Sequence, residues 1–298
     1  MSEFKTGFVA LVGRPNVGKS TLLNHLLGQK ISITSRKPQT TRHRILGVKT
    51  EPHWQIVYVD TPGIHDDQRD AMHRYLSKAA SGALADVDVI VFVIEALNWR
   101  KDDDAVLARL KDSTAPILLL INKIDKIKDK SRLLPVITEV QEKGEFKQVI
   151  PVSALKGENL TALETELVKL IPESPALFPE EQVTDRSLRF LVAEIIREKL
   201  MRQLGQELPY SLAVELERYE EKPNILNIGA VIWVNRTNQK AIVIGKGGQR
   251  IKEIGTQART DIEKTVDKKV HLELWVKVKE GWADDERALR SLGYGDEY

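Results

Sequence analysis

The stretch GRPNVGKS at residues 13–20 follows an apolar run, FVALVG at 8–13, and precedes a helical pattern, STLLNHLLG. It fits the phosphate-loop pattern GxxxxGK[ST], whose glycines let backbone N–H groups turn toward phosphate oxygens. We predict that Lys19 contacts the β- and γ-phosphates and that Ser20 binds Mg²⁺. The dipole of the following helix favours the same anion. A ligand-free βα turn is the alternative interpretation, and the rest of the chain argues against it.

Further apolar runs at 54–60, 89–96, 117–122 and 148–154 alternate with amphipathic segments. Several runs are almost continuous in Val, Ile and Leu, which is typical of parallel strands covered on both faces. The sequence therefore predicts an α/β fold, a phosphate-loop domain with a mostly parallel, doubly wound sheet.

Two motifs at strand ends indicate which nucleotide binds. DTPG at 60–63 places Asp60 where it can hold Mg²⁺ through water, and it places the N–H of Gly63 near the γ-phosphate. NKID at 122–125 places Asp125 where one carboxylate can accept both guanine N1–H and N2–H. Adenine has no such pair of donors and would leave a carboxylate oxygen unpaired, so we predict GTP rather than ATP.

The other expected guanine contacts surround Asp125. Asn122 approaches the N7 side and ties loops together, the stem of Lys123 lies along the base, and SALKG at 153–157 offers the Ala154 N–H to guanine O6. The carboxyl ends of parallel strands are where α/β proteins bind ligands. The residues assigned to GTP or GDP are Gly13, Asn16, Val17, Gly18, Lys19, Ser20, Thr21, Asp60, Gly63, Asn122, Lys123, Asp125, Ser153 and Ala154.

The chain changes character after the helix that ends near Leu170. Residues 171–185 hold three prolines and no clear periodicity, so they are predicted to form a linker. Beyond them the order α-β-β-α-α-β predicts a small α+β domain. We expect a nucleotide domain at 1–172, a linker at 173–185 and a second domain at 186–298. The second domain's elements are expected at 187–203, 210–218, 227–236, on both sides of 245–248, and at 270–279.

A GxxG loop at 245–248 lies between two expected helices, as in a type II KH domain, which binds single-stranded RNA. Residues 236–279 hold eleven Lys or Arg against five acidic residues, an excess that suggests a polyanionic partner, although charge alone fits a solvated charged face equally well. We assign RNA contacts to Ile244, Gly245, Lys246, Gly247, Gly248 and Arg250. Ile251, Ile254, Ala258 and Ile262 recur at helical spacing and are assigned to the core. Trp275 could stack on a base, but we expect a neighbouring helix to cover it, and His271 is expected at the surface.

Composition sets outer limits on function. The chain has no cysteine, which excludes disulfides and thiolate metal sites. No apolar stretch is long enough to cross a bilayer, and the amino terminus lacks the pattern of a secretory signal. We therefore expect a monomeric cytoplasmic protein, with a peripheral contact at the cytoplasmic face of the inner membrane as an additional prediction.

Several phrases resemble the Era family of bacterial GTPases, part of the TrmE-Era-EngA-like group. They are GRPNVGKSTLLN, SRKPQTTRHR, YVDTPG and NKID in the first half, and TDRSLRF, EIIREKLMR and HLELWVKVKEGWADDERALRSLGY in the second. The resemblance covers essentially the whole chain. It implies a GTPase switch whose RNA is the 3′ end of small-subunit ribosomal RNA and which acts in small ribosomal subunit assembly.

The resemblance also implies roles for individual residues. Thr41, or alternatively Thr40, would complete the Mg²⁺ shell within a switch loop at 35–44, and Asn16 would hold K⁺. DTPGIHDDQRD would be the second switch. Ile64 stands where Ras-like enzymes carry a water-orienting glutamine, and Gln68 is too distant, so slow turnover is expected. The residues assigned to catalysis are Lys19, Thr41, Asp60 and Gly63.

A function of another class also fits the sequence. The chain could be an interaction GTPase at the membrane surface or in cell-cycle control, with its KH fold docking protein or lipid. The basic stretch suits anionic lipid, but no amphipathic helix with an apolar membrane face accompanies it. RNA binding is therefore the favoured prediction.

Overall fold

The computed structural model describes residues 3–35, 37, 40–63, 86–205, 212–282, 285 and 289. The chain forms two compact units, and each is described here by itself. The first holds residues up to Ser32, from Thr41 to the DTPG motif, and from 86 to Asp185. The second holds Ile33–Thr40 together with the chain from Arg186 onward.

The first unit is built on a six-stranded sheet in the order β2-β3-β1-β4-β5-β6. All neighbouring strands are parallel except β2 and β3. The strands are β1 (Lys5–Val12), β2 (Ile45–Glu51), β3 (Trp54–Asp60), β4 (Val89–Glu95), β5 (Ile117–Asn122) and β6 (Gln148–Pro151). The apolar runs thus form the expected mostly parallel sheet, and their carboxyl ends share one edge.

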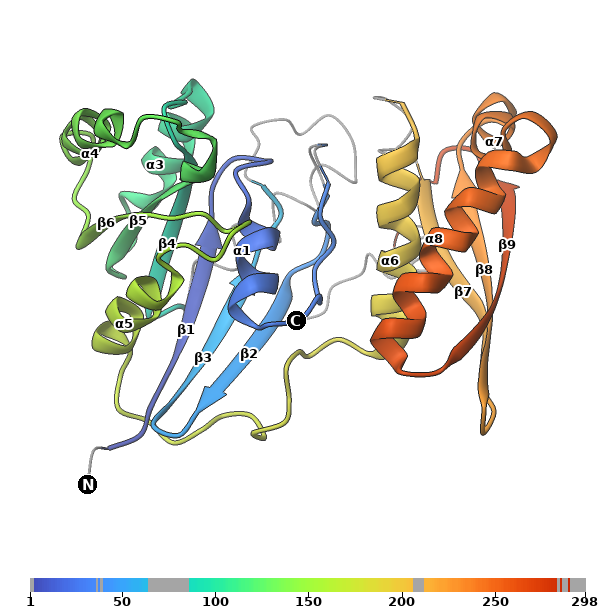
Figure 1. Cartoon of the computed structure of the whole chain (residues 1–298), viewed down its shortest axis with the longest axis horizontal. Helices are drawn as coiled ribbons and strands as arrows, with labels where there is room; N and C mark the ends of the chain where they lie inside the picture. The colour runs from blue at the N-terminus through green and yellow to red at the C-terminus, as the bar shows by residue number, and fades with distance from the viewer. Residues whose placement is uncertain are drawn as a thin grey trace. The chain divides into compact units, whose positions relative to one another are not determined.

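Helices cover both faces of this sheet, as expected for a doubly wound fold (Figure 1). α3 (Lys101–Leu110) and α4 (Leu133–Gln141) share one apolar core with β1, β4 and β5. α1 (Lys19–Leu26) and α5 (Leu160–Leu170) lie on the other face. Because both faces are covered, the residues of β4 from Val89 to Ile94 are fully buried, which explains the continuous apolar sequence of this strand.

One strand of the sheet was not predicted. β2, ILGVKTE, mixes buried, half-buried and exposed residues, and it pairs antiparallel with β3 at the edge of the sheet. An edge strand needs no continuous apolar run, so its sequence gave no clear signal.

The segment expected to be a linker lies along this unit. The N–H of Thr6 donates to Pro172 O at 3.1 Å, and the N–H of Val48 donates to Val183 O at 2.8 Å. The buried side chain of Gln55 accepts from the N–H of Phe178 at 3.0 Å. Residues 171–185 contain no helix and only isolated β-bridges, at Glu173 and Thr184, and hydrogen bonds fix them to the sheet.

The second unit contains a three-stranded sheet in the order β7-β8-β9, with β7 and β8 antiparallel and β8 and β9 parallel. Its elements are α6 (Leu188–Gln203), β7 (Leu212–Glu221), β8 (Ile225–Val234), α7 (Thr237–Ile244), the 3₁₀ turn η4 (Lys246–Gly248), α8 (Gln249–Val266) and β9 (Lys269–Val278). This is the expected α-β-β-α-α-β order. Figure 1 shows α6 and α8 side by side over one face of the sheet.

The core of the second unit lies between these two helices and the sheet. Ile254, Ala258 and Ile262 of α8 are fully buried in it, as predicted. Ile251 is only partly buried. Trp275 is 44% exposed, so the expectation that a helix covers it is wrong; its ring packs over Gly229 of the neighbouring strand. In the described ranges no helix has the length and apolar character needed to span a bilayer.

Candidate functional site

The phosphate loop has a backbone that only glycine suits at two positions. Gly13 has φ 152° and Gly18 has φ 110°. A Cβ at Gly13 would lie 2.4 Å from the carbonyl oxygen of Val93, and one at Gly18 would lie 2.3 Å from Nδ2 of Asn122. The loop is therefore packed against the ends of β4 and β5, and side chains are excluded by contact as well as by conformation.

Lys19, the first residue of α1, is buried beneath this loop. Its ammonium donates to the carbonyl oxygens of Gly13 at 2.9 Å and Arg14 at 3.2 Å. Burial lowers the pKa of Lys19 to about 8, although the charge of Asp60 opposes the shift. The ammonium group of Lys19 thus lies on the concave side of the loop, where it could bind an anionic phosphate.

Three hydroxyls converge on Asp60 at the end of β3, and we call this group the hydroxyl cluster: Ser20, Ser32, Thr41 and Asp60. Ser20 Oγ and Ser32 Oγ each donate to Asp60 Oδ2 at 2.8 Å, and Thr41 Oγ1 lies 2.8 Å from Ser20 Oγ. Burial raises the pKa of Asp60, and the Lys19 charge and the hydroxyl hydrogen bonds oppose it. Ser32 was not predicted, because an isolated serine carries no sequence signal.

The hydroxyl cluster fits a small divalent cation. Among the described residues Asp60 Oδ1 is buried and has no hydrogen-bond partner. Carboxylate and hydroxyl oxygens are hard ligands of the kind Mg²⁺ prefers. Thr40 is not in the cluster, since its hydroxyl donates to Lys37 O at 2.6 Å. Geometry therefore favours Thr41 over Thr40, the alternative that the sequence left open.

The base-recognition loops are joined to the phosphate loop by Asn122, as expected. Its Nδ2 donates to Val17 O at 2.7 Å, and its Oδ1 accepts from the N–H of Ala154 at 2.9 Å. Asp125 Oδ1 accepts from Ser153 Oγ at 2.6 Å, which orients the carboxylate. Because Asn122 engages the Ala154 N–H, the expected contact with guanine O6 would have to share or exchange that bond.

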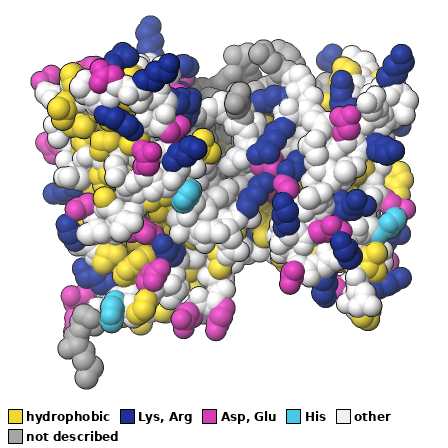
Figure 2. Space-filling model, in the orientation of Figure 1, with side chains coloured by type: hydrophobic (Ala, Val, Ile, Leu, Met, Phe, Trp, Pro, Cys, Tyr) yellow, Lys and Arg dark blue, Asp and Glu magenta, His cyan; other side chains and the backbone are white. Residues whose placement is uncertain are grey.

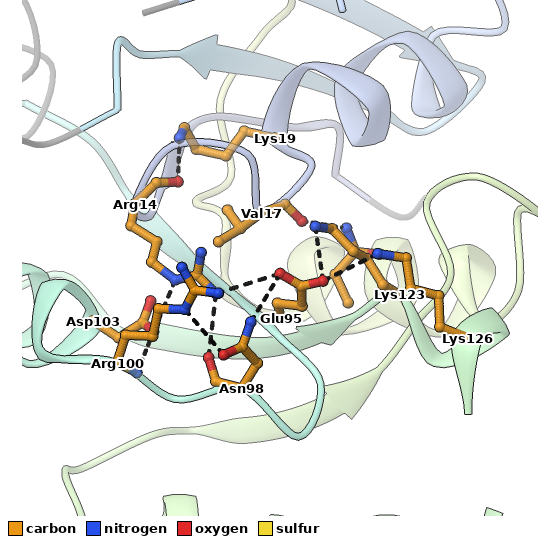
Figure 3. A network of polar contacts seen from close by, with 10 residues as sticks. Arg14, Val17, Lys19, Glu95, Asn98, Arg100, Asp103, Lys123 and Lys126 are labelled. Carbon is orange, nitrogen blue, oxygen red and sulfur yellow. Dashed lines mark hydrogen bonds and ion pairs between the residues drawn. The ribbon is translucent and has the colours of Figure 1, made fainter. Parts of the chain in front are cut away.

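Figure 3 shows a group of charged and polar side chains between these loops, which we call the carboxylate network: Arg14, Glu95, Asn98, Asp103, Lys123 and Lys126. Glu95 Oε1 lies 3.1 Å from the ammonium groups of both Lys123 and Lys126. Burial raises the pKa of Glu95, but the hydrogen bonds and charges of the two lysines outweigh it and bring the pKa to about 2. Sequence reasoning missed Glu95 and Asp103, because no motif marks their distance from Arg14.

The remaining nucleotide residues are placed in part. Gly63 packs so closely on the phosphate loop that a Cβ there would lie 2.7 Å from Cγ of Pro15. Asn16 has a left-handed backbone, φ 64°, at the tip of the same loop, where a tight turn requires it. Val17 is fully buried in the loop, and Thr21 follows Ser20 on α1 as a half-buried residue. Ile64, Gln68 and the second expected switch beyond Gly63 lie outside the described residues.

In the second unit the GxxG loop forms a turn with three left-handed glycines. Gly245, Gly247 and Gly248 have φ 76°, 58° and 77°. No atom lies within 4 Å of a Cβ built on Gly247 or Gly248, so this backbone is open. Lys246 is exposed beside it, and Ile244, the last residue of α7, is half-buried. The guanidinium of Arg250 donates to Ile242 O at the end of α7, so it fixes the turn in addition to its predicted RNA role.

Next to this loop a groove of about 400 Å³ runs between α8 and β9. It is lined by Ile251, Lys252, Gly255, Thr256, Arg259, His271, Leu272 and Leu274. Lys and Arg side chains are spread over the face on which α8 lies (Figure 2). Sequence reasoning placed Ile251 in the core and His271 at the surface but did not foresee the groove, because its two walls come from separate elements.

The segment Ile33–Thr40 of the second unit packs on α6. Glu198 Oε1 accepts from the N–H of Thr34 at 2.9 Å, and Arg202 donates to Thr34 Oγ1 at 2.9 Å. Arg197 donates to Thr40 O. These bonds give partners to Glu198 and Arg197, two of the buried charged residues of α6. The segment falls between Ser32 and Thr41, both members of the hydroxyl cluster.

Two family models match separate parts of the chain. Residues 8–123 match a model described as a 50S ribosome-binding GTPase, and residues 207–283 match a KH domain. The first match contains the phosphate loop, DTPG and the start of NKID. The second contains the GxxG loop and the groove.

Relatives match the chain over its full length. GTPase Era of Histophilus somni is 57% identical over all of both chains, and GTPase Era of Pseudomonas fluorescens is 56% identical over 98% of this chain and 97% of its own. A crystal structure of Era with MgGDPNP and nucleotides 1506–1542 of 16S ribosomal RNA has a TM-score of 0.95 and 45% identity, covering 98% of this chain and 100% of that one. A variant of Aquifex aeolicus Era bound to GDP·AlF₄⁻ has the same TM-score, the same coverage and 44% identity. The chain is therefore a GTPase and belongs to the Era family.

Proposed function

We propose that the chain is a GTP-driven switch that binds single-stranded RNA, the 3′ end of small-subunit ribosomal RNA, and acts in assembly of the small ribosomal subunit. The observation that carries this proposal is an open GxxG loop, together with a groove whose α8 wall holds Lys252 and Arg259, in the same chain as the phosphate loop. The similar Era structure with 16S ribosomal RNA supports it. One family model names the large subunit, but it covers only residues 8–123, whereas that structure matches almost the whole chain.

The nucleotide half of the proposal uses residues 1–172. Lys19 neutralises the phosphates, Gly63 donates its N–H to the γ-phosphate, and Asp125 selects guanine. The Mg²⁺ ion would be held by Ser20, Thr41 and Asp60, and it would neutralise charge on the β- and γ-phosphate oxygens. The unpartnered oxygen of Asp60 and the nearby hydroxyls support this assignment. Asn16 at the loop tip would hold K⁺ beside the same phosphates.

Hydrolysis in this site is slow, because Ile64 can neither donate nor accept a hydrogen bond to the attacking water. The chain's own residues contribute position and charge and form no covalent bond to phosphate. Lys19 supplies the positive charge nearest the phosphates. K⁺ at Asn16 would add to this charge in the transition state.

The segment Ile33–Thr40 belongs to the second unit and directly precedes Thr41 of the first unit in the chain. One flank is Thr41, which lies in the hydroxyl cluster and is assigned to the Mg²⁺ site. The other contacts of the segment are with Glu198, Arg202 and Arg197 of α6. A change at Thr41 would therefore alter the packing on α6, which is a recognised form of switching.

RNA binding is assigned to residues 186–298, with 173–185 as the connection between the two domains. The chain acts as a cytoplasmic monomer, with peripheral contact at the inner membrane as a secondary property. A membrane or cell-cycle role as the main function is not favoured, since the groove and loop already suit a nucleic-acid strand.

The test is binding of single-stranded RNA with the sequence of nucleotides 1506–1542 by the GTP-bound chain at several salt concentrations. Gly247→Asp places an anion on the open loop and should weaken binding about tenfold or more, since it repels phosphate. Gly281→Asp is a matched control, because Gly281 is also left-handed, φ 67°, with open space at its Cβ. Equal RNA affinity of the two variants would contradict the proposal.

A further inference from the structure

The starting point is the place of Glu95 in the sheet. It ends β4, which lies between β1 and β5. β1 leads into the phosphate loop, and β5 ends at Asn122, the residue paired with Glu95 in register. A carboxylate at this position faces the loop that holds phosphates on one side and the loop that reads the base on the other.

Each oxygen of Glu95 contacts a different loop (Figure 3). Oε2 accepts from the guanidinium of Arg14 at 3.5 Å and from Nδ2 of Asn98 at 3.3 Å. Oε1 contacts the ammonium groups of Lys123 and Lys126, each at 3.1 Å. The carboxylate thus bridges the phosphate loop and the NKID motif.

Arg14 is itself fixed by other partners. Its Nε donates to the fully buried Asp103 at 3.0 Å, and its guanidinium donates to Asn98 O at 3.2 Å. Arg14 is only 4% exposed. The arginine end of the bridge is therefore rigid, and Glu95 transmits that position to Lys123.

Lys123 needs such support. It has a left-handed backbone, φ 69°, which is uncommon for a lysine and is held only when its surroundings determine it. Burial lowers the pKa of Lys123, and the hydrogen bond and charge of Glu95 oppose this. Without the carboxylate, the ammonium would lose its partner and the long side chain would be free to leave the base.

We propose that Glu95 is a positioning residue for nucleotide binding: it fixes Lys123 against the base and couples that lysine, through Arg14, to the phosphate loop. This inference rests on the proposed guanine site, in which the stem of Lys123 lies along the base. Glu95 does not touch the nucleotide. Its effect on affinity passes through Lys123.

Lys126 distinguishes this role from a purely structural salt bridge. It contacts the same oxygen at the same distance as Lys123, but its side chain is 63% exposed and lies outside the base-recognition residues. If the salt bridges of Glu95 only stabilised the fold, replacing Lys123 or Lys126 would have similar effects on GDP release. A positioning role makes Lys123 essential and Lys126 dispensable.

The experiment measures the dissociation rate of fluorescent GDP from the full chain at fixed Mg²⁺ and salt, in Glu95→Gln, Lys123→Met, the double variant and Lys126→Met. Glu95→Gln and Lys123→Met should each accelerate dissociation about tenfold, roughly 1.4 kcal/mol. The double variant should match Lys123→Met alone, because the two residues act in one pathway. Lys126→Met should stay within about twofold of the wild type.

Inosine diphosphate provides a second readout. It lacks the exocyclic amine that Asp125 is assigned to bind, but it keeps the ring against which Lys123 lies. Glu95→Gln should therefore accelerate the release of both nucleotides by the same factor. A change in stability alone would lower the melting temperature of the nucleotide-free chain without changing either rate, and that result overturns the inference.

The experiment distinguishes failure of the guanine-site assignment from failure of the positioning role of Glu95. If Lys123→Met leaves GDP release unchanged, the guanine-site assignment is wrong and the inference fails with it. Alternatively, Lys123→Met accelerates GDP release and the double variant releases GDP faster still, by the product of the two single-variant factors. In that case the guanine site is correct and only the positioning role is wrong. An effect of Lys126→Met equal to that of Glu95→Gln also overturns the positioning role.

Discussion

The phosphate loop and the GxxG loop have similar local backbone conformations but different surroundings. Both GRPNVGKS and VIGKGGQR place left-handed glycines directly before a helix, whose first N–H groups have no acceptor within the helix. In the phosphate loop a Cβ on Gly13 or Gly18 would collide with neighbouring atoms. In the GxxG loop a Cβ on Gly247 or Gly248 would meet nothing within 4 Å.

The difference lies in what surrounds each loop. The phosphate loop is enclosed by the ends of β4 and β5, and its lysine is buried, so its shape is fixed before any ligand arrives. The GxxG loop is exposed with its lysine beside it. A closed loop suits one small ligand of fixed geometry, whereas an open one suits a strand that extends past it.

The largest effect is expected from a substitution that disrupts the phosphate loop. Gly18→Ala adds a methyl group 2.3 Å from Asn122 Nδ2 at a strained φ, so GDP affinity should fall at least about 100-fold. Gly28→Ala is the matched control, because Gly28 has φ 68° and open space at its Cβ. Equilibrium titration with fluorescent GDP measures both. Comparable losses in the two variants would show that backbone conformation, and not enclosure, is what matters.

A smaller effect concerns the network behind the closed loop. The pKa of Glu95, about 2 in the folded chain, lies below its ordinary value of 4.5. Its contribution to stability is therefore complete above pH 4.5 and is lost as the pH falls toward 2, with a slope of at most about 1.4 kcal/mol per pH unit.

Denaturant unfolding at pH 5, 4 and 3 tests this pH dependence. The transition to follow is the one that moves when GDP is added. The free energy of unfolding of the wild type should approach that of Glu95→Gln as the pH falls, because glutamine does not titrate. Glu158→Gln, which removes an exposed ion pair with Lys130, should show no such change. A constant difference for Glu95→Gln would mean that its charge does not stabilise the fold.

The smallest expected effect tests the open loop. Lys246→Ala and Lys252→Ala should each reduce the slope of log affinity against log salt by about 0.7 for single-stranded RNA, because each removes about one phosphate contact. Lys264→Ala is the control, since Lys264 is exposed on α8 but does not line the groove. An equal change in all three would indicate a diffuse charged surface in place of a defined path.

The sequence predicted features that depend on neighbours along the chain. Lys19, Asp60 and Asn122 stand at fixed distances from strand ends, so their convergence follows from a parallel sheet. The GxxG loop was found in the same way. Element order also sufficed for both sheets apart from β2, whose sequence is that of an edge strand.

Features built from distant segments could not be predicted. Arg14 and Asp103 form a buried ion pair across 89 positions, and no motif relates them. The groove has one wall on α8 and the other on β9, so His271 resembled any surface histidine. Trp275 was misjudged because alternation along a strand shows that a residue faces outward but not what lies over it.

The hydrogen bonds of residues 171–185 have a consequence for the isolated nucleotide domain. β2 is an edge strand, and the N–H of its Val48 donates to Val183 O, while Gln55 on the neighbouring β3 accepts from the N–H of Phe178. A polypeptide ending at residue 172 would present a bare strand to solvent, which is a template for pairing with a second copy. One ending at 185 would keep that edge occupied. We therefore expect the shorter polypeptide to self-associate more strongly than the longer one.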